Sequence, residues 1–239
     1  LEFGDGLGDD LVRQHLEELV AGRLVEFRER VVVDVGPEEL HELRPVALFE
    51  LLDHVREVGR FEALHQRLDL RPIAAVDRLA ALTRGELAAE FGLSCTLAAE
   101  VSRPEVLFFA TLLHDVGKAI GGTDHSQRGA EMARPILARL GLAPEDVDEV
   151  CHLILKHLVM YHAATRRDLD DPATIAEFCR EVRGREGLRD LFLLTVADLS
   201  TTSPTSMTSW KARMLDELYL AADAALTGKA EGDERLGRA

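Results

Sequence analysis

Residues 106–117 read VLFFATLLHDVG and form the most apolar stretch of the chain. A Pro-Glu pair precedes this stretch, which is typical of the first turn of an α-helix. We therefore predict a buried helix that ends at Gly117. Its polar end carries His114 and Asp115, and burying an imidazole and a carboxylate is costly unless other groups pair with them. Taken alone, this dipeptide fits a cap at the helix end as well as it fits a functional site.

The rest of the chain repeats the helical spacing of apolar side chains and shows no alternation of strands and helices. We expect helices at residues 10–29, 36–58, 72–82, 84–101, 124 onward, 144–160, 171 onward, 188–199 and 210–226. Short connections join most of these segments, and no pattern of a nucleotide-binding sheet is present. The predicted fold class is therefore all-α, a helical bundle.

The composition narrows the range of functions. The 239 residues include 43 acidic and 28 basic side chains, a formal net charge of -15. Such a charge repels a phosphate backbone at long range, so we expect no nucleic-acid partner. No apolar run is long enough to span a membrane and no signal-peptide pattern occurs, so we expect no membrane partner.

The first residue is Leu1 rather than Met, which suggests a fragment or an excised domain. The three cysteines form no CxxC pair, which favours reduced thiols and a cytoplasmic location.

Three further polar side chains lie where a packed core would favour leucine. His125 follows a Gly-Gly turn, His157 lies in an apolar helical frame, and Asp198 lies within the apolar segment LFLLTVADLS. An ionised carboxylate in that segment needs a cation or several hydrogen-bond donors. With His114 and Asp115, these residues supply imidazole nitrogens and carboxylate oxygens, which suit Mn, Fe, Zn or Mg. The hypothesis is a divalent-metal site formed by residues from separate helices.

Three longer strings are more specific than the dipeptide. LLHDVGKAIGGTDHSQRGAEMA begins at residue 112, LILKHLVMYHAATRRDLDDP at residue 153 and LLTVADLSTTSPTSMTSWK at residue 193. They resemble the HD domain of the bifunctional PII uridylyltransferase/uridylyl-removing enzyme, within the HD metal-dependent phosphohydrolase superfamily. The resemblance implies an all-α HD-domain helical bundle, which we expect at residues 60–228. We expect residues 1–59 to be an N-terminal helical segment of unknown role and residues 229–239 to be a flexible tail.

The resemblance also implies what the site does. The residues that it places at or beside the metal are His114, Asp115, His125, His157 and Asp198. It places Lys118 near the substrate phosphate, so that Asp115 and Lys118 are the implied catalytic residues. The implied cofactor is one or two divalent ions of Mn, Mg or Fe. In that family the domain hydrolyses the phosphodiester that joins a uridylyl group to a tyrosine of the PII signal protein, which acts in nitrogen regulation, and releases UMP.

The sequence departs from the family pattern at two places. Arg71 stands where the family has a histidine ligand, and a guanidinium cannot bind a metal because it stays protonated; His65 is a candidate substitute. Lys156 and His157 stand where the family often has two histidines. Two alternatives therefore remain open beside deuridylylation of PII. One is hydrolysis of a small phosphorylated substrate such as a nucleotide or an alarmone, and the other is a catalytically impaired regulatory module.

Overall fold

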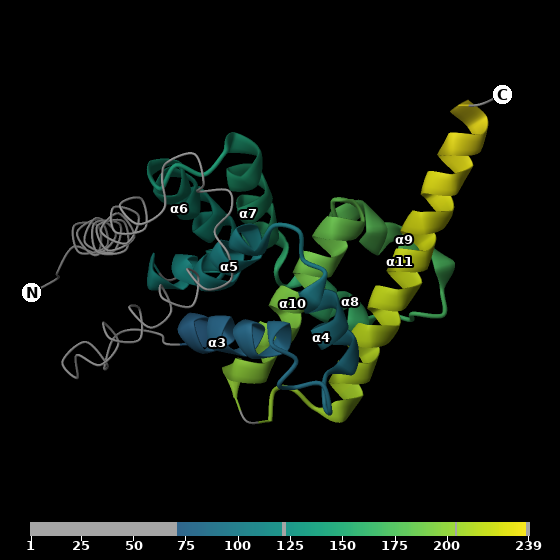
Figure 1. Ribbon diagram of the computed structural model, residues 1–239, viewed down its shortest axis with the longest axis horizontal. Coiled ribbons are helices and arrows are strands. Elements are labelled where there is room, and N and C mark those ends of the chain that lie inside the picture. The colour runs from purple at the N-terminus through teal and green to yellow at the C-terminus, as the bar shows by residue number, and fades with distance from the viewer. Residues whose placement is uncertain (1–70, 121–122, 204, 238–239) are drawn as a thin grey trace, which may run out of the picture. The chain divides into compact units, whose positions relative to one another are not determined.

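The structure, a computed structural model, describes residues 71–120, 123–203 and 205–237 (Figure 1). Within these ranges the backbone forms helices joined by turns and contains no strand, which confirms the all-α prediction. The elements are α3 (Arg71–Thr83), α4 (Gly92–Ala99), α5 (Pro104–Leu113), the 3-10 helix η2 (Val116–Ile120), α6 (His125–Arg139), α7 (Pro144–Lys156), α8 (Val159–Arg166), α9 (Pro172–Glu181), α10 (Gly184–Thr202) and α11 (Ser209–Gly237). The helices predicted at 10–29 and 36–58, and His65, lie outside the described residues. None of the described helices combines the length and apolar character that crossing a bilayer requires.

The described residues divide into two compact units. The first unit contains α5, η2, α6 and nearly all of α7 (Figure 1). Its buried apolar side chains include Val106, Leu107, Phe108, Met132, Ile136, Leu137, Leu153 and Ile154. Burial of one such side chain stabilises the fold by roughly 1.5–3 kcal/mol, so this core fixes α5 firmly. The hydroxyl of Thr111, buried in the same helix, donates to the Leu107 carbonyl at 2.8 Å.

Within the first unit, η2 and the start of α6 approach each other so closely that only glycine fits between them. A Cβ atom placed on Gly117 would lie 2.0 Å from the carbonyl oxygen of His125 and 2.7 Å from the backbone nitrogen of Gly129. A Cβ on Gly129 would lie 3.2 Å from Cγ2 of Ile154. Gly117 therefore sets the distance between the segment that follows Asp115 and the first turn of α6.

The second unit contains α3, α4, α8, α9, α10 and α11. α10 contacts α3, α4, α8 and α11, and its residues 191–197 are all buried. This burial on every side explains why the segment reads as a continuous apolar run rather than as an amphipathic helix. α11 contacts α8, α9 and α10, and the ring of its Tyr219 lies 4.9 Å from that of Phe192 on α10. Apolar packing around α10 therefore holds this unit together.

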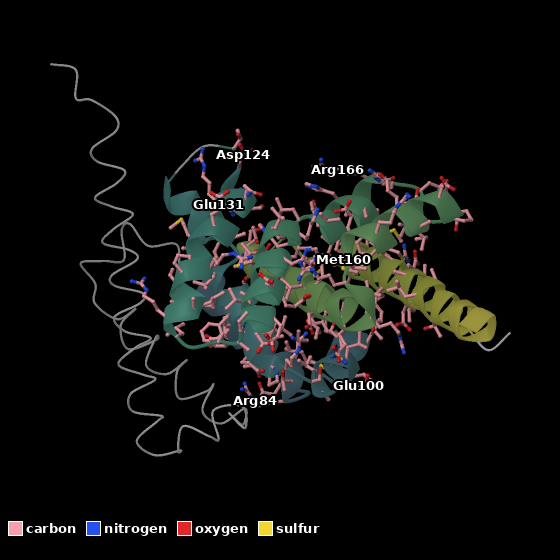
Figure 2. All side chains as sticks on the ribbon, turned by 90° about the horizontal axis from the view of Figure 1, so that it is seen from above. Arg84, Glu100, Asp124, Glu131, Met160 and Arg166 are labelled. Atoms are coloured by element: carbon pink, nitrogen blue, oxygen red, sulfur yellow. The ribbon has the colours of Figure 1, made fainter. Side chains whose placement is uncertain are left out.

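The short helix α8 has one buried and one exposed side. Met160 is fully buried, whereas Arg166, at the end of the helix, is exposed at the edge of the molecule (Figure 2). His162 is exposed on the same helix. The backbone N–H of His162 donates to the Leu158 carbonyl at 3.1 Å, so the first helical turn begins directly after His157.

Several helices differ from their predicted bounds. The segment predicted at 84–101 is helical only over α4, because α3 ends at a glycine in the left-handed conformation, Gly85 with φ of 72°. The Gly85 N–H donates to the Leu82 carbonyl at 2.9 Å and the Glu86 N–H to the Ala81 carbonyl at 3.1 Å, the hydrogen-bond pattern of a helix that ends at a glycine.

The helix predicted at 144–160 consists of two helices, since α7 ends at Lys156 and α8 begins at Val159. His157 consequently lies in a turn and not within a helix. Neither glycine nor proline occurs near this break, so the local sequence carries no signal of it.

Candidate metal centre

His114 and Asp115 occupy the turn between α5 and η2. The helix predicted to end at Gly117 ends at Leu113, and the Lys118 N–H then donates to the Asp115 carbonyl at 2.9 Å to close the 3-10 turn. Both side chains are buried, with exposed fractions of 0% for His114 and 6% for Asp115. The turn that follows the apolar helix α5 thus places an imidazole and a carboxylate in the interior of the first unit.

A hydrogen bond fixes which nitrogen of His114 carries a proton. Nδ1 lies 2.7 Å from the Thr111 carbonyl oxygen, and because a carbonyl can only accept, Nδ1 is the donor. In a neutral imidazole the lone pair is then on Nε2, the atom that lies 3.4 Å from Oδ2 of Asp115. A lone pair and a carboxylate oxygen repel each other at this distance. A proton on Nε2, or a cation bound to both atoms, removes the repulsion.

Asp115 is ionised and surrounded by three nitrogen-bearing side chains of its own unit. Nζ of Lys118 lies 2.6 Å from Oδ2, and Nε2 of His125 lies 3.7 Å from Oδ1. Burial raises the pKa of the Asp115 carboxyl, but the neighbouring His114 and Lys118 side chains outweigh burial and hold this pKa well below its usual range. The carboxylate is therefore available as a ligand at neutral pH.

His125 is the first residue of α6, and its position follows from the contact between η2 and α6. Its carbonyl oxygen is the atom that would lie nearest to a Cβ atom placed on Gly117. The side chain is largely buried, with 19% of its surface exposed. The first unit thus brings four of the predicted residues together: His114, Asp115, Lys118 and His125.

The second unit contains the other two predicted ligands. His157 is 3% exposed in the turn between α7 and α8. Asp198 lies on α10, half-buried, and its Oδ1 accepts a hydrogen bond from the Thr202 hydroxyl at 3.1 Å. Among the residues of this unit that the structure describes, these two occur in candidate metal-binding groups. Imidazole and carboxylate are a donor set that fits a divalent ion.

The two positions at which we expect the chain to depart from the family pattern also lie in the second unit. Arg71 is the first residue of α3 and is half-buried. Nζ of Lys156 lies 2.6 Å from Oε2 of Glu181 on α9, an ion pair within this unit. Lys156 is therefore held by a carboxylate of α9.

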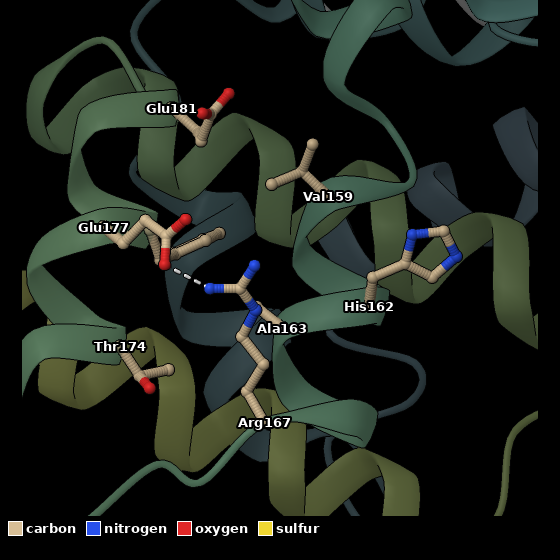
Figure 3. Close-up of a pocket in the computed structure, with 8 residues that line it drawn as sticks. Val159, His162, Ala163, Arg167, Thr174, Glu177 and Glu181 are labelled. Carbon is tan, nitrogen blue, oxygen red and sulfur yellow. Dashed lines mark hydrogen bonds and ion pairs between the residues drawn. The ribbon is translucent and has the colours of Figure 1, made fainter. Parts of the chain in front are cut away.

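The string RRDLDDP at residues 166–172 has a structural explanation. Asp171 is the N-cap of α9 and accepts from the Ala173 N–H at 2.9 Å, with a proline at the next position. Asp168 accepts from the Asp170 N–H at 3.0 Å, and Arg167 forms an ion pair with Glu177 (Figure 3). These contacts fold the loop between α8 and α9, and the Arg167–Glu177 pair borders an open pocket of about 270 Å³. Sequence reasoning did not find this pocket, because its lining residues come from two helices and share no motif.

Comparison with known proteins places the chain in a family. A family model described as the HD domain matches residues 53–201. The bifunctional uridylyltransferase/uridylyl-removing enzyme of Gluconobacter oxydans (strain 621H) is 39% identical over 191 residues, which cover 79% of this chain and 20% of that protein. The enzyme of the same name from Erythrobacter litoralis (strain HTCC2594) is 42% identical over 158 residues, 66% of this chain and 17% of that protein. The chain thus spans about a fifth of the length of these relatives. Because the family match covers more than half of the chain, from residue 53 to residue 201, this chain belongs to the HD domain family.

Proposed function

We propose that this chain is a metal-dependent phosphohydrolase domain that removes uridylyl groups from the PII signal protein. The observation that carries the proposal is the pairing of His114 Nε2 with Asp115 Oδ2 at 3.4 Å inside the first unit. Since Nδ1 of His114 donates to the Thr111 carbonyl, the Nε2 lone pair is directed to the side where the carboxylate lies. A divalent ion bound by both atoms stabilises this arrangement.

The proposed ligands are His114, Asp115, His125, His157 and Asp198. All of them lie within the range that matches the HD domain. When bound, a divalent ion lowers the pKa of its water and polarises phosphoryl oxygens, which supplies a nucleophile near neutral pH. Lys118 orients the Asp115 carboxylate, and 41% of the lysine side chain is exposed, so that its ammonium is accessible to an anionic substrate.

The uridylyl group of the proposed substrate rests on the name of the relatives, which are uridylyl-removing enzymes, and PII rests on the resemblance of the three sequence strings. The bond to be hydrolysed joins a uridylyl phosphate to a tyrosine of PII. A cytoplasmic location is supported by the three buried free cysteines, Cys95, Cys151 and Cys179, since reduced thiols persist in a reducing compartment.

A second candidate function is a regulatory HD module without turnover. It is favoured by Arg71, which stands half-buried at the start of α3 where the family has a histidine ligand. One ligand fewer lowers metal affinity, and the same fold then serves to bind a partner.

The experiment is a comparison of metal binding and hydrolysis in the wild type and in Asp115→Asn. Asp170→Asn is the matched control, because Asp170 is an exposed aspartate in the loop before α9. Thermal unfolding is measured with and without Mn²⁺, since an ion that binds the folded state at a hundredfold excess over its Kd stabilises it by about 2.7 kcal/mol. Hydrolysis is then assayed on uridylylated PII, on a nucleotide and on a chromogenic phosphodiester.

We expect Mn²⁺ to raise the melting temperature of the wild type and of Asp170→Asn but not that of Asp115→Asn, and only the first two proteins to release UMP from PII. Turnover of the nucleotide alone assigns a small substrate in place of PII. Metal binding without any turnover identifies the regulatory module. A wild type that binds no divalent ion rules out the metal centre altogether.

A further inference from the structure

One lysine of the second unit differs from the other lysines whose side chains the structure describes. Lys118 pairs with Asp115 and Lys156 pairs with Glu181, each at 2.6 Å. Lys211, near the start of α11, instead donates to the Ser206 carbonyl at 2.7 Å, and its Nζ lies 5.5 Å from the centre of the Tyr161 ring. Within the described ranges no carboxylate forms an ion pair with it. A half-buried ammonium thus has only neutral partners in a chain with a net charge of -15.

Hydrogen bonds, together with the peptide bond between Thr202 and Ser203, connect this ammonium to the end of α10 that carries Asp198. The Thr202 hydroxyl donates to Oδ1 of Asp198 at 3.1 Å. Ser203, the next residue, has its hydroxyl 2.7 Å from that of Ser206, whose carbonyl accepts from Lys211. The polar chain from Asp198 to Lys211 therefore runs through the loop between α10 and α11 without leaving the second unit.

The aromatic partner of Lys211 connects it to the other proposed ligand of this unit. Tyr161 follows His157 by four residues and lies on α8, which contacts α11. Lys211 consequently lies at the end of the second unit where the turn with His157 and the last turns of α10 are found. Its ammonium is already held by the Ser206 carbonyl and the Tyr161 ring, so little side-chain entropy remains to be lost when the ammonium binds a ligand.

We propose that Lys211 binds an anionic oxygen of the phosphorylated substrate at the end of the second unit that carries His157 and Asp198, and that it determines the affinity for this substrate. The inference rests on the proposed function. It adds a residue that contacts the substrate, separate from the metal ligands and from Lys118. The physical basis is that the Lys211 ammonium contacts a carbonyl oxygen and an aromatic ring, neither of which carries a negative charge. Its positive charge therefore remains available to an anion.

The test compares Lys211→Gln, Lys211→Arg and the control Arg213→Gln in the full chain loaded with Mg²⁺. Arg213 lies two residues further along α11 and pairs with Glu217 at 3.7 Å on the exposed surface, so its loss removes the same charge without touching Tyr161 or Ser206. Two quantities are measured: the Kd for inorganic phosphate by calorimetry, and the KM and kcat for a chromogenic phosphodiester. Thermal unfolding shows whether the variants fold.

We expect Lys211→Gln to weaken phosphate binding and raise KM about tenfold, the effect of one lost hydrogen bond to a charged group. Lys211→Arg should retain most of the affinity, and Arg213→Gln should behave as the wild type. If Lys211→Gln lowers the melting temperature but leaves the Kd for phosphate unchanged, Lys211 only fixes the loop and the inference is wrong. A wild type that binds no phosphate also overturns it. If phosphate binding depends on Lys211 but the wild type hydrolyses no ester, the anion site stands and the proposed function fails.

Discussion

The contact between Gly117 and α6 gives the sharpest test of how the metal centre is positioned. In Gly117→Ala the new Cβ would lie 2.0 Å from the His125 carbonyl oxygen, whereas real Cβ atoms essentially never approach a heavy atom within 3.0 Å. Because the neighbouring atoms belong to the backbone, the start of α6 must move away by about 1 Å or more. Overpacking of a core lowers the free energy of unfolding by about 1–3 kcal/mol. We expect Gly117→Ala to lie at the upper end of this range, because the atoms that must move belong to the backbone.

For a chain of this size, about 3 kcal/mol corresponds to a fall in melting temperature of roughly 6–12 °C. The same movement carries the His125 imidazole away from Asp115, whose Oδ1 lies 3.7 Å from Nε2, so the affinity for Mn²⁺ should fall as well. Circular dichroism measures the first effect and calorimetric titration with Mn²⁺ the second.

The matched control is Gly92→Ala at the start of α4. Apart from the local backbone, no heavy atom lies within 4 Å of a Cβ placed there, so this variant should keep or slightly raise the melting temperature. The reasoning is refuted if Gly117→Ala melts within about 1 °C of the wild type and binds Mn²⁺ with the same affinity.

Three further predictions follow from single contacts. Burial and the charge of Arg166 lower the pKa of His162. Below pH 6.5 the unfolded chain therefore binds more protons than the folded chain, and the free energy of unfolding falls there. Arg166→Gln should raise the His162 pKa in an NMR titration, and an unchanged value would contradict the assigned cause. Asp171→Ala removes the N-cap of α9 and should cost about 1 kcal/mol in chemical denaturation without changing metal affinity; a loss of metal binding would show that the RRDLDDP loop belongs to the site. Arg71→His should increase the affinity for Mn²⁺ in calorimetry, and equal affinity would show that residue 71 does not correspond to the family's histidine.

Local sequence patterns were sufficient for the fold class and for most helices. Apolar spacing such as that of residues 106–113 specifies a buried helix, because the period of 3.6 residues is a property of the segment itself. The proline at position 172 and the aspartate before it likewise indicated the start of α9. The same reasoning placed the end of this helix within one residue of the observed end of α3, but it began the next helix at residue 84, although Gly85 is the residue type that a left-handed helix terminus requires.

The candidate site was predicted less completely. Residue type alone singled out His114, Asp115 and His125, since imidazoles and carboxylates in apolar surroundings need a partner. Their relation to one another was not in the sequence. That Nδ1 of His114 donates to Thr111, and that Lys118 binds the Asp115 carboxylate, depends on a turn whose geometry is set by the close approach of η2 to α6.

The sequence by itself determined that the chain is helical and that it belongs among HD domains, and it singled out the side chains that are candidate metal ligands. Only the tertiary structure decided that α7 ends before His157, that Lys156 is held by Glu181 and that Lys211 lies over Tyr161. The physical reason is that helical periodicity is fixed by neighbours along the chain, whereas the partners of a charged side chain are fixed by helix packing. Lys211 and Tyr161 are separated by 50 positions, and no local pattern relates them.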